Sequence, residues 1–189
     1  MKAILKNMFK RAWGIITAGN FTWDEIASEK APAGRVRKEY VYPWIIFAII
    51  LSFVFPALYA SQRPLEGGLV SAIITAITLF GGYFASVFVS FAYLKKSKPD
   101  LASRNDCETV IAYSYTIIIL IEIITTIVPS LFFLRILSIF VAYVIWESCR
   151  AVWMLKEEDR GSVVLVFSIA VIFIPVIINR LIHWMLPNA

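Results

Sequence analysis

The chain contains few of the residues that usually carry out catalysis or hold metals. It has a single histidine, His183, and two cysteines, Cys107 and Cys149, that do not form a Cys-x-x-Cys pair. One histidine excludes a histidine-rich zinc site, and two isolated cysteines make a poor metal site. The sequence also lacks His-Glu-x-x-His, Gly-x-Ser-x-Gly and phosphate-binding loop motifs. We therefore expect no enzymatic activity, no cofactor and no catalytic or metal site.

Charge is also absent over long stretches of the chain. Residues 67–94 form a run of 28 residues without a charge, and residues 161–179 form another of 19. A helix needs roughly 20 apolar residues to cross the hydrocarbon core of a bilayer. These runs do not alternate as the strands of a membrane barrel do, and a helix satisfies its own backbone groups in lipid. The sequence therefore predicts an all-α polytopic membrane protein.

The apolar stretches predict five transmembrane helices in one bundle that covers residues 42–189. Their expected bounds are about 42–60, 68–94, 109–129, 131–153 and 163–186. Small residues recur along one side of the second span, at Ser71, Thr75, Gly82, Ser86 and Ser90. Such a stripe favours the close approach of another helix, in the bundle or in a dimer. A water-lined path along this stripe is the alternative.

Residues 1–41 form a separate segment ahead of the bundle, and residues 1–19 predict an amphipathic helix. Apolar residues recur at helical spacing on one face, namely Ile4, Leu5, Met8, Phe9, Ala12, Trp13 and Ile16. Lys2, Lys6, Asn7, Lys10 and Arg11 occupy the other face. We expect this helix to lie in the membrane interface, with anionic lipid head groups rather than nucleic acid as its partner. The alternative is a partner-binding helix packed on the cytosolic mouth of the bundle.

A second short helix is expected after the break at Gly19 and Asn20. Thr22 and Glu25 have the spacing of a capping box, in which each side chain bonds the backbone N–H of the other residue. The helix is expected to end near residue 29 or 30, because the Ala-Pro-Ala-Gly stretch at 31–34 breaks it.

The basic residues predict the orientation of the chain. Of the 18 Lys and Arg residues, 15 fall in residues 1–41, 95–108 and 150–160, which lie on one side of the expected spans. The excess of Lys and Arg in cytoplasmic loops places the N-terminus in the cytoplasm and, after five spans, the C-terminus outside. Cys107 and Cys149 then lie on the cytoplasmic side, where a disulfide is not expected.

Glu122 lies within the third expected span, where an ionisable residue is costly and needs a partner. Arg135 and Arg180 lie at a comparable depth on the fourth and fifth spans, so we expect Glu122 to pair with one of them. Asn179 and His183, four residues apart on the fifth span, would extend this intramembrane polar cluster. One interpretation is an ion pair that fixes helix register. The other is an ion or proton site.

Two short stretches of the sequence have recognisable patterns. Trp23-Asp24-Glu25-Ile26-Ala27-Ser28-Glu29 reads Trp-x-x-Ile-x-x-Glu, and Ala112-Tyr113-Ser114 places a small residue before a tyrosine at the start of the third span. With the layout, both stretches resemble the Yip family, the Ypt/Rab-interacting membrane proteins and their bacterial relatives, whose short bacterial members have these patterns after the amphipathic helix and at the start of the third span. The resemblance implies five spans, a short far-side tail and a place in the bacterial inner membrane.

The resemblance further implies a non-enzymatic organising or adaptor component. Trp23, Ile26 and Glu29 are then the contact candidates on the cytoplasmic face. Their structural alternatives are an interface anchor for Trp23 and an ion pair of Glu29 with Arg35 or Arg37. The resemblance does not decide whether the protein forms a homo-oligomer or has a membrane-protein partner. The alternative function is a small transporter or channel with a polar site around Glu122, Arg180 and His183.

Overall fold

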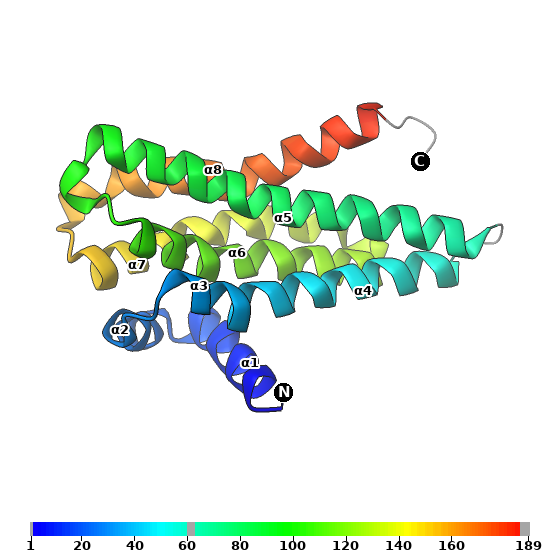
Figure 1. The fold of residues 1–189 in the computed structure, drawn as a ribbon, viewed down its shortest axis with the longest axis horizontal. Helices are drawn as coiled ribbons and strands as arrows, with labels where there is room; N and C mark the ends of the chain where they lie inside the picture. Colours follow the sequence, from blue (N-terminus) through cyan, green and yellow to red (C-terminus); the bar gives the residue numbers. More distant parts are fainter. Residues whose placement is uncertain (1, 60–62, 186–189) are drawn as a thin grey trace.

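The computed structural model describes residues 2–59 and 63–185, and all of their regular structure is helical (Figure 1). The elements are α1 (Lys2–Thr17), α2 (Gly19–Glu29), α3 (Ala33–Val36), the π-helix η1 (Arg37–Val41), α4 (Tyr42–Tyr59), α5 (Pro64–Ser97), the 3-10 helix η2 (Pro99–Leu101), α6 (Arg104–Ile127), the 3-10 helix η3 (Pro129–Ile139), α7 (Phe140–Trp153) and α8 (Glu157–Met185). The described chain therefore has the all-α class that the sequence predicts.

Within residues 2–59 and 63–185, five helical stretches are long and apolar enough to cross a membrane. They are Ala33–Tyr59, Pro64–Ser97, Arg104–Ile127, Pro129–Trp153 and Glu157–Met185. The expected spans 42–60 and 163–186 each end at a residue outside the described ones. Elsewhere the bounds of the five expected spans agree with these helices to within a few turns. The prediction of five membrane-spanning helices is confirmed.

The two ends of the bundle are called here the proximal end and the distal end. The proximal end carries η2 and the connection between α7 and α8, and α1 and α2 pack beside it (Figure 1). The distal end carries the C-terminal end of α4, the start of α5 and the C-terminal turns of α8. Helix α6 is the most enclosed span, with 61% of its most apolar window buried, so the other helices pack around it.

Small residues on α5 allow its neighbours to approach closely. At Gly68 an added Cβ would lie 2.6 Å from the backbone oxygen of Phe53 on α4. Thr75 donates a hydrogen bond of 3.0 Å to Ser52 on α4, and Ser86 donates one of 2.9 Å to the carbonyl oxygen of Ala170 on α8. Thr75 and Ser86 of the small-residue stripe therefore serve helix packing within the chain, as the sequence predicts, whereas Ser71 lines a hollow described below.

Gly82 on α5 lies tightly against Tyr115 of α6 and Pro175 of α8. An added Cβ at Gly82 would overlap the Tyr115 hydroxyl and lie 2.8 Å from Cγ of Pro175, which sits inside α8. A proline within a helix removes a backbone hydrogen bond and bends the helix. Beyond this residue the last turns of α8 lead away from α5 toward the C-terminus (Figure 1). The bend opens a hollow at the distal end between the two helices.

We expect Gly82→Ala to lower the free energy of unfolding by about 1–3 kcal/mol, the usual cost of forcing extra atoms into a packed interior. Gly81→Ala is the matched control, because its Cβ would meet only Cδ1 of Ile178 at 3.4 Å. Both changes gain the same helix propensity of roughly 1 kcal/mol. Denaturation of both variants in detergent micelles tests the difference, and equal stabilities would show that α5 and α8 tolerate separation here.

The fourth span differs from the expected continuous helix. Its first 11 residues form the 3-10 helix η3, and Leu131 within it has φ −86° and ψ 22°, outside the helical range. A 3-10 helix has three residues per turn and eclipses the side chains at i and i+3. Arg135 and Ser138 on η3 therefore share one face.

The N-terminal segment also differs in detail. Helix α2 begins at Gly19 with Ala18 as its N-cap, and the Thr22 N–H donates to the Ala18 carbonyl oxygen over 3.1 Å. The predicted capping box at Thr22 and Glu25 is wrong, because the helix starts three residues earlier and already satisfies that N–H. The break between the two helices falls at Ala18, so the predicted break at Gly19 and Asn20 is wrong, because both residues belong to α2. The expected end near residue 29 agrees with α2.

Candidate functional site

Glu122 on α6 pairs with Arg135 on η3, one of its two predicted partners. Oε2 of Glu122 lies 3.5 Å from an Nη atom of Arg135. The Glu122 side chain is 29% exposed and that of Arg135 is 61% exposed, so the pair lies at the wall of a hollow rather than in a sealed interior. A single long contact of this kind leaves both groups able to exchange partners.

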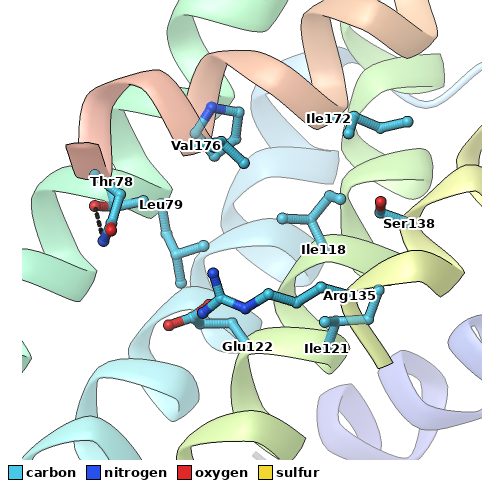
Figure 2. Close-up of a pocket in the computed structure, with 11 residues that line it drawn as sticks. Thr78, Leu79, Ile118, Ile121, Glu122, Arg135, Ser138, Ile172 and Val176 are labelled. Atoms are coloured by element: carbon cyan, nitrogen blue, oxygen red, sulfur yellow. Dashed lines mark hydrogen bonds and ion pairs between the residues drawn. The ribbon is translucent and has the colours of Figure 1, made fainter. Parts of the chain in front are cut away.

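A small inner chamber of about 100 Å³ lies beside this ion pair (Figure 2). Four elements line it: Thr78 and Leu79 from α5, Ile118, Ile121 and Glu122 from α6, Arg135 and Ser138 from η3, and Ile172, Pro175, Val176 and Asn179 from α8. Figure 2 shows Glu122 and Arg135 side by side on one wall, with Ile118 between them and α8. Most of the walls are therefore apolar.

A larger hollow, here called the distal cleft, has a volume of about 840 Å³. It is lined by Arg63, Glu66, Gly67, Val70, Ser71, Ile74 and Thr75 at the start of α5, and by Glu122, Arg135, Asn179 and His183. Glu122, Arg135 and Asn179 line both hollows, so the inner chamber continues the distal cleft. The bend of α8 at Pro175 accounts for the space between α5 and α8.

The distal cleft holds a second ion pair and two further polar groups. Nη1 of Arg63 lies 3.1 Å from Oε2 of Glu66, and both side chains are exposed. Asn179 donates a hydrogen bond of 3.4 Å to Oγ1 of Thr78, which orients its amide across the junction of the two hollows. His183 lines the cleft and is exposed. The cleft therefore presents groups of both charge signs together with hydrogen-bonding side chains.

The structure brings together four of the five residues of the predicted polar cluster. Glu122, Arg135, Asn179 and His183 line the distal cleft. Arg180 does not line it and is exposed beside Val176 and Leu181 on α8. The alternative pairing of Glu122 with Arg180 is wrong, because consecutive helical residues such as Asn179 and Arg180 face different directions.

A second charged cluster lies near the proximal end, and the sequence analysis missed it. Nε of Arg37 lies 2.5 Å from Oε1 of Glu108, and the Tyr83 hydroxyl donates to the same oxygen over 3.2 Å. The Glu108 side chain is only 4% exposed. Arg37 belongs to the π-helix η1, a distortion that recurs at functional sites.

Glu108 was missed because the third span was predicted to begin near residue 109, which left residues 95–108 outside the spans. Helix α6 begins at Arg104 instead, and the Ser103 hydroxyl accepts a hydrogen bond of 3.3 Å from the Asp106 N–H as its N-cap. A serine followed by an acidic residue in the first turn is a helix-start signal. That signal would have extended the helix by more than one turn and carried Glu108 into the bundle.

The predicted cytoplasmic contact residues are largely enclosed. Trp23 is 0% and Ile26 is 4% exposed, and the Trp23 ring packs edge-on against Tyr113 of α6 at 5.9 Å between centroids. The prediction that Trp23 and Ile26 offer a free surface is therefore wrong, because both fill the contact between α2 and the bundle. The alternative of an interface anchor for Trp23 is wrong for the same reason.

Glu29 has a different partner from the predicted ones. It accepts from Nη2 of Arg11 on α1, at 2.6 Å for one of its oxygens, and Arg11 also donates to the Tyr113 hydroxyl. Arg35 pairs with Glu39 and Arg37 with Glu108, so the predicted pairing of Glu29 with Arg35 or Arg37 is wrong. Partial burial by itself lowers the pKa of Arg11, but the bonds and charges of Glu29 and Tyr113 raise the pKa overall, and the guanidinium stays charged.

A second link fastens α2 to α7. Arg150 contacts Oδ1 of Asp24 at 3.0 Å, pairs with Glu147 at 3.3 Å as the spacing on α7 predicts, and donates to the carbonyl oxygen of Asn20 at 3.2 Å. Together with Arg11 and Trp23, this contact makes α1 and α2 part of the folded bundle. The N-terminal helices α1 and α2 are therefore packed on the bundle and do not extend away from it.

Comparison of the chain with models of known protein families, with characterised proteins and with solved structures finds no match.

Proposed function

We propose that the chain is a non-enzymatic integral membrane protein that binds a ligand in the distal cleft, which corresponds to the small-transporter alternative. One observation carries the proposal: the Glu122–Arg135 pair opens onto a continuous hollow of about 840 Å³. Ligand sites in proteins are typically concave, with volumes of about 300–1,000 Å³ and a few convergent polar groups.

The energetics of charge at membrane depth support a binding role. Charged side chains in membrane helices are costly, and they face cavities or partners where they serve a substrate or ion. A purely structural ion pair is most favourable when it is enclosed and fully hydrogen-bonded. Arg135 is 61% exposed, makes one long contact and lines both hollows, so its remaining donors are available to a ligand there.

The proposed orientation places the cleft on the outer side of a bacterial inner membrane. The excess of Lys and Arg at the proximal end puts that end in the cytoplasm. The N-terminus is then cytoplasmic and the C-terminus lies outside. A ligand would reach the distal cleft from the outer leaflet or the outer aqueous phase.

A Yip-type organising or adaptor role is the second candidate, and an exposed apolar surface on α1 and α2 favours it. Phe9, Trp13, Ile16 and Phe21 are exposed by 40–82% although these helices lie outside the five spans. An amphipathic helix that lies in the membrane interface buries such residues among the lipid chains, while basic residues such as Lys10 face anionic head groups. This role needs the outward face of α1 and α2 rather than Trp23 and Ile26.

Cysteine labelling tests whether the distal cleft is hydrated. In a Cys107→Ala, Cys149→Ala background, a cysteine at Ser71 on the cleft wall should react with a water-soluble thiol reagent in membrane vesicles. A cysteine at Ile73 should stay unreactive, because this residue is 50% exposed on the apolar outside of α5, two residues away. Both original cysteines are buried, so their replacement removes little from the surface.

The comparison between the two positions decides the proposal. A Ser71→Cys variant as unreactive as Ile73→Cys would mean that the cleft is closed to water, and the ligand-binding function would fail. Prior addition of an impermeant blocker from the outside should abolish labelling at position 71 if the proposed orientation holds.

A further inference from the structure

The two connected hollows differ in chemical character, and the difference points to the class of ligand. The distal cleft carries Arg63, Glu66, Glu122 and Arg135, two positive and two negative groups. The inner chamber is walled mainly by Leu79, Ile118, Ile121, Ile172 and Val176. A polar compartment that continues into an apolar one suits a molecule with a polar head and an apolar tail.

The contact between η3 and α8, here called the seam, offers such a tail a route from the membrane into the inner chamber. Ser138 on η3 and Ile172 on α8 line the inner chamber, while neighbouring Ile139 and Phe173 are 66% and 54% exposed on the apolar outside. Among the described residues no hydrogen bond or ion pair joins η3 to α8, so only van der Waals contacts close the seam. The inner chamber holds only a short stretch of a hydrocarbon chain, and the remainder would stay in the bilayer.

The charges of the cleft favour a ligand without net charge. Its two arginines and two glutamates balance, and among the described residues on its wall His183 is the remaining titratable group. Arginine side chains bind phosphate oxygens with two parallel donors, and glutamates attract an ammonium group. Arg135 and Glu122 are held by one contact of 3.5 Å, which a phosphate and an ammonium group would replace with two separate ion pairs.

We propose that the distal cleft binds the head group of a zwitterionic phospholipid, with one acyl chain entering the inner chamber through the seam between η3 and α8. This inference rests on the proposed ligand-binding function and names the class of ligand. Phosphatidylethanolamine, with one phosphate and one primary ammonium group, has the matching chemistry. The protein would take such a lipid from the outer half of the bilayer.

Native mass spectrometry of the full chain in detergent, titrated with phosphatidylethanolamine in mixed micelles, tests the proposal. The wild type should retain one lipid and bind it at least tenfold more tightly than glycerophosphoethanolamine, which has the head group without chains. Glu122→Gln and Arg135→Gln should each weaken phosphatidylethanolamine binding by about tenfold, because each removes one charge-assisted hydrogen bond.

A matched pair of variants tests the acyl chain's place. Val176→Phe fills the inner chamber and should lower lipid occupancy severalfold. Ile177→Phe should leave occupancy unchanged, because Ile177 is 54% exposed on the outside of α8 and lines neither hollow. Both residues lie at the surface of α8, so both variants are expected to fold.

The outcomes separate this inference from the proposed function. Binding of glycerophosphoethanolamine as tight as that of the whole lipid would assign the cleft to a soluble ligand and overturn the lipid proposal. Equal retention of phosphatidylglycerol and phosphatidylethanolamine, insensitive to Glu122→Gln and Arg135→Gln, would mean unspecific surface lipid and also overturn it. If either result were combined with a reactive Ser71→Cys variant, the proposed ligand site would stand and only the lipid proposal would fail. An unreactive Ser71→Cys variant would overturn both proposals.

Discussion

Replacement of Glu108 by leucine is expected to lower the free energy of unfolding by about 3–5 kcal/mol, the usual cost of removing one partner of a buried ion pair. Arg37 would lose the carboxylate that lies 2.5 Å from its Nε, and the Tyr83 hydroxyl would lose its acceptor. Tyr83 is fully buried and the Arg37 side chain is 29% exposed, so the two groups would be left without a partner where water reaches them only in part. Reversible denaturation in detergent micelles measures the change.

A double replacement is the control for this prediction. Arg37→Met together with Glu108→Leu removes both charges, and a buried pair replaced by apolar side chains of similar size often costs little or nothing. The double variant should therefore be more stable than Glu108→Leu alone. If it is as unstable as the single variant, the loss comes from the shape of the site and not from the unpaired guanidinium.

Trp23→Ala is expected to cost about 3–5 kcal/mol of stability, the range for truncating a fully buried aromatic side chain. Trp23 is 0% exposed and fills the contact between α2 and Tyr113. Its loss leaves a cavity in the same contact that the Arg11–Glu29 and Arg150–Asp24 pairs hold together. Denaturation in micelles and the rate of tryptic cleavage within residues 2–30 measure the effect.

Phe21→Ala is the matched control on the same helix. Phe21 is 82% exposed, so its removal should change stability little and leave tryptic cleavage slow. Comparable losses for the two variants would mean that α2 is not docked through Trp23. The same Phe21→Ala variant should bind less well to anionic vesicles if the outward face of α1 and α2 meets the membrane.

The docked N-terminal helices change how an adaptor function has to be understood. The Trp-x-x-Ile-x-x-Glu stretch supplies residues that hold α2 on the bundle, and its glutamate closes an ion pair with α1. A partner would therefore meet the outer face of these helices, where Phe9 and Trp13 are exposed. The distal cleft lies at the opposite end of the bundle, so the two proposed surfaces can be tested independently.

The number and approximate bounds of the spans followed from the sequence because a bilayer acts on composition alone. A segment without charges over roughly 20 residues is favoured in the hydrocarbon core whatever its neighbours are. The predicted spans were too short where polar residues continue a helix beyond its apolar run. Helix α5 extends to Ser97 and α6 begins at Arg104, and the latter extension carries Glu108 into the bundle.

The partners of the charged residues followed from the sequence only in part. Depth along the spans limited the partners of Glu122 to Arg135 and Arg180, because both lie near the same level. The choice between them depends on the rotation of each helix, which the packing of Gly82 against Pro175 and the 3-10 geometry of η3 determine. The partner of Glu29 was predicted to be Arg35 or Arg37, which follow it in the sequence, and the actual partner is Arg11 on the preceding helix α1.

The sequence by itself determined that five apolar helices are stacked in one bundle and that charge near Glu122 requires a partner, since both follow from the cost of placing polar groups in hydrocarbon. Only the tertiary structure decided that the space beside this pair is hollow, that Trp23 is enclosed, and that Glu108 meets Arg37. Such features depend on which faces of separate helices meet. Which faces meet depends on how several helices pack together. The residue order within any one helix does not determine it.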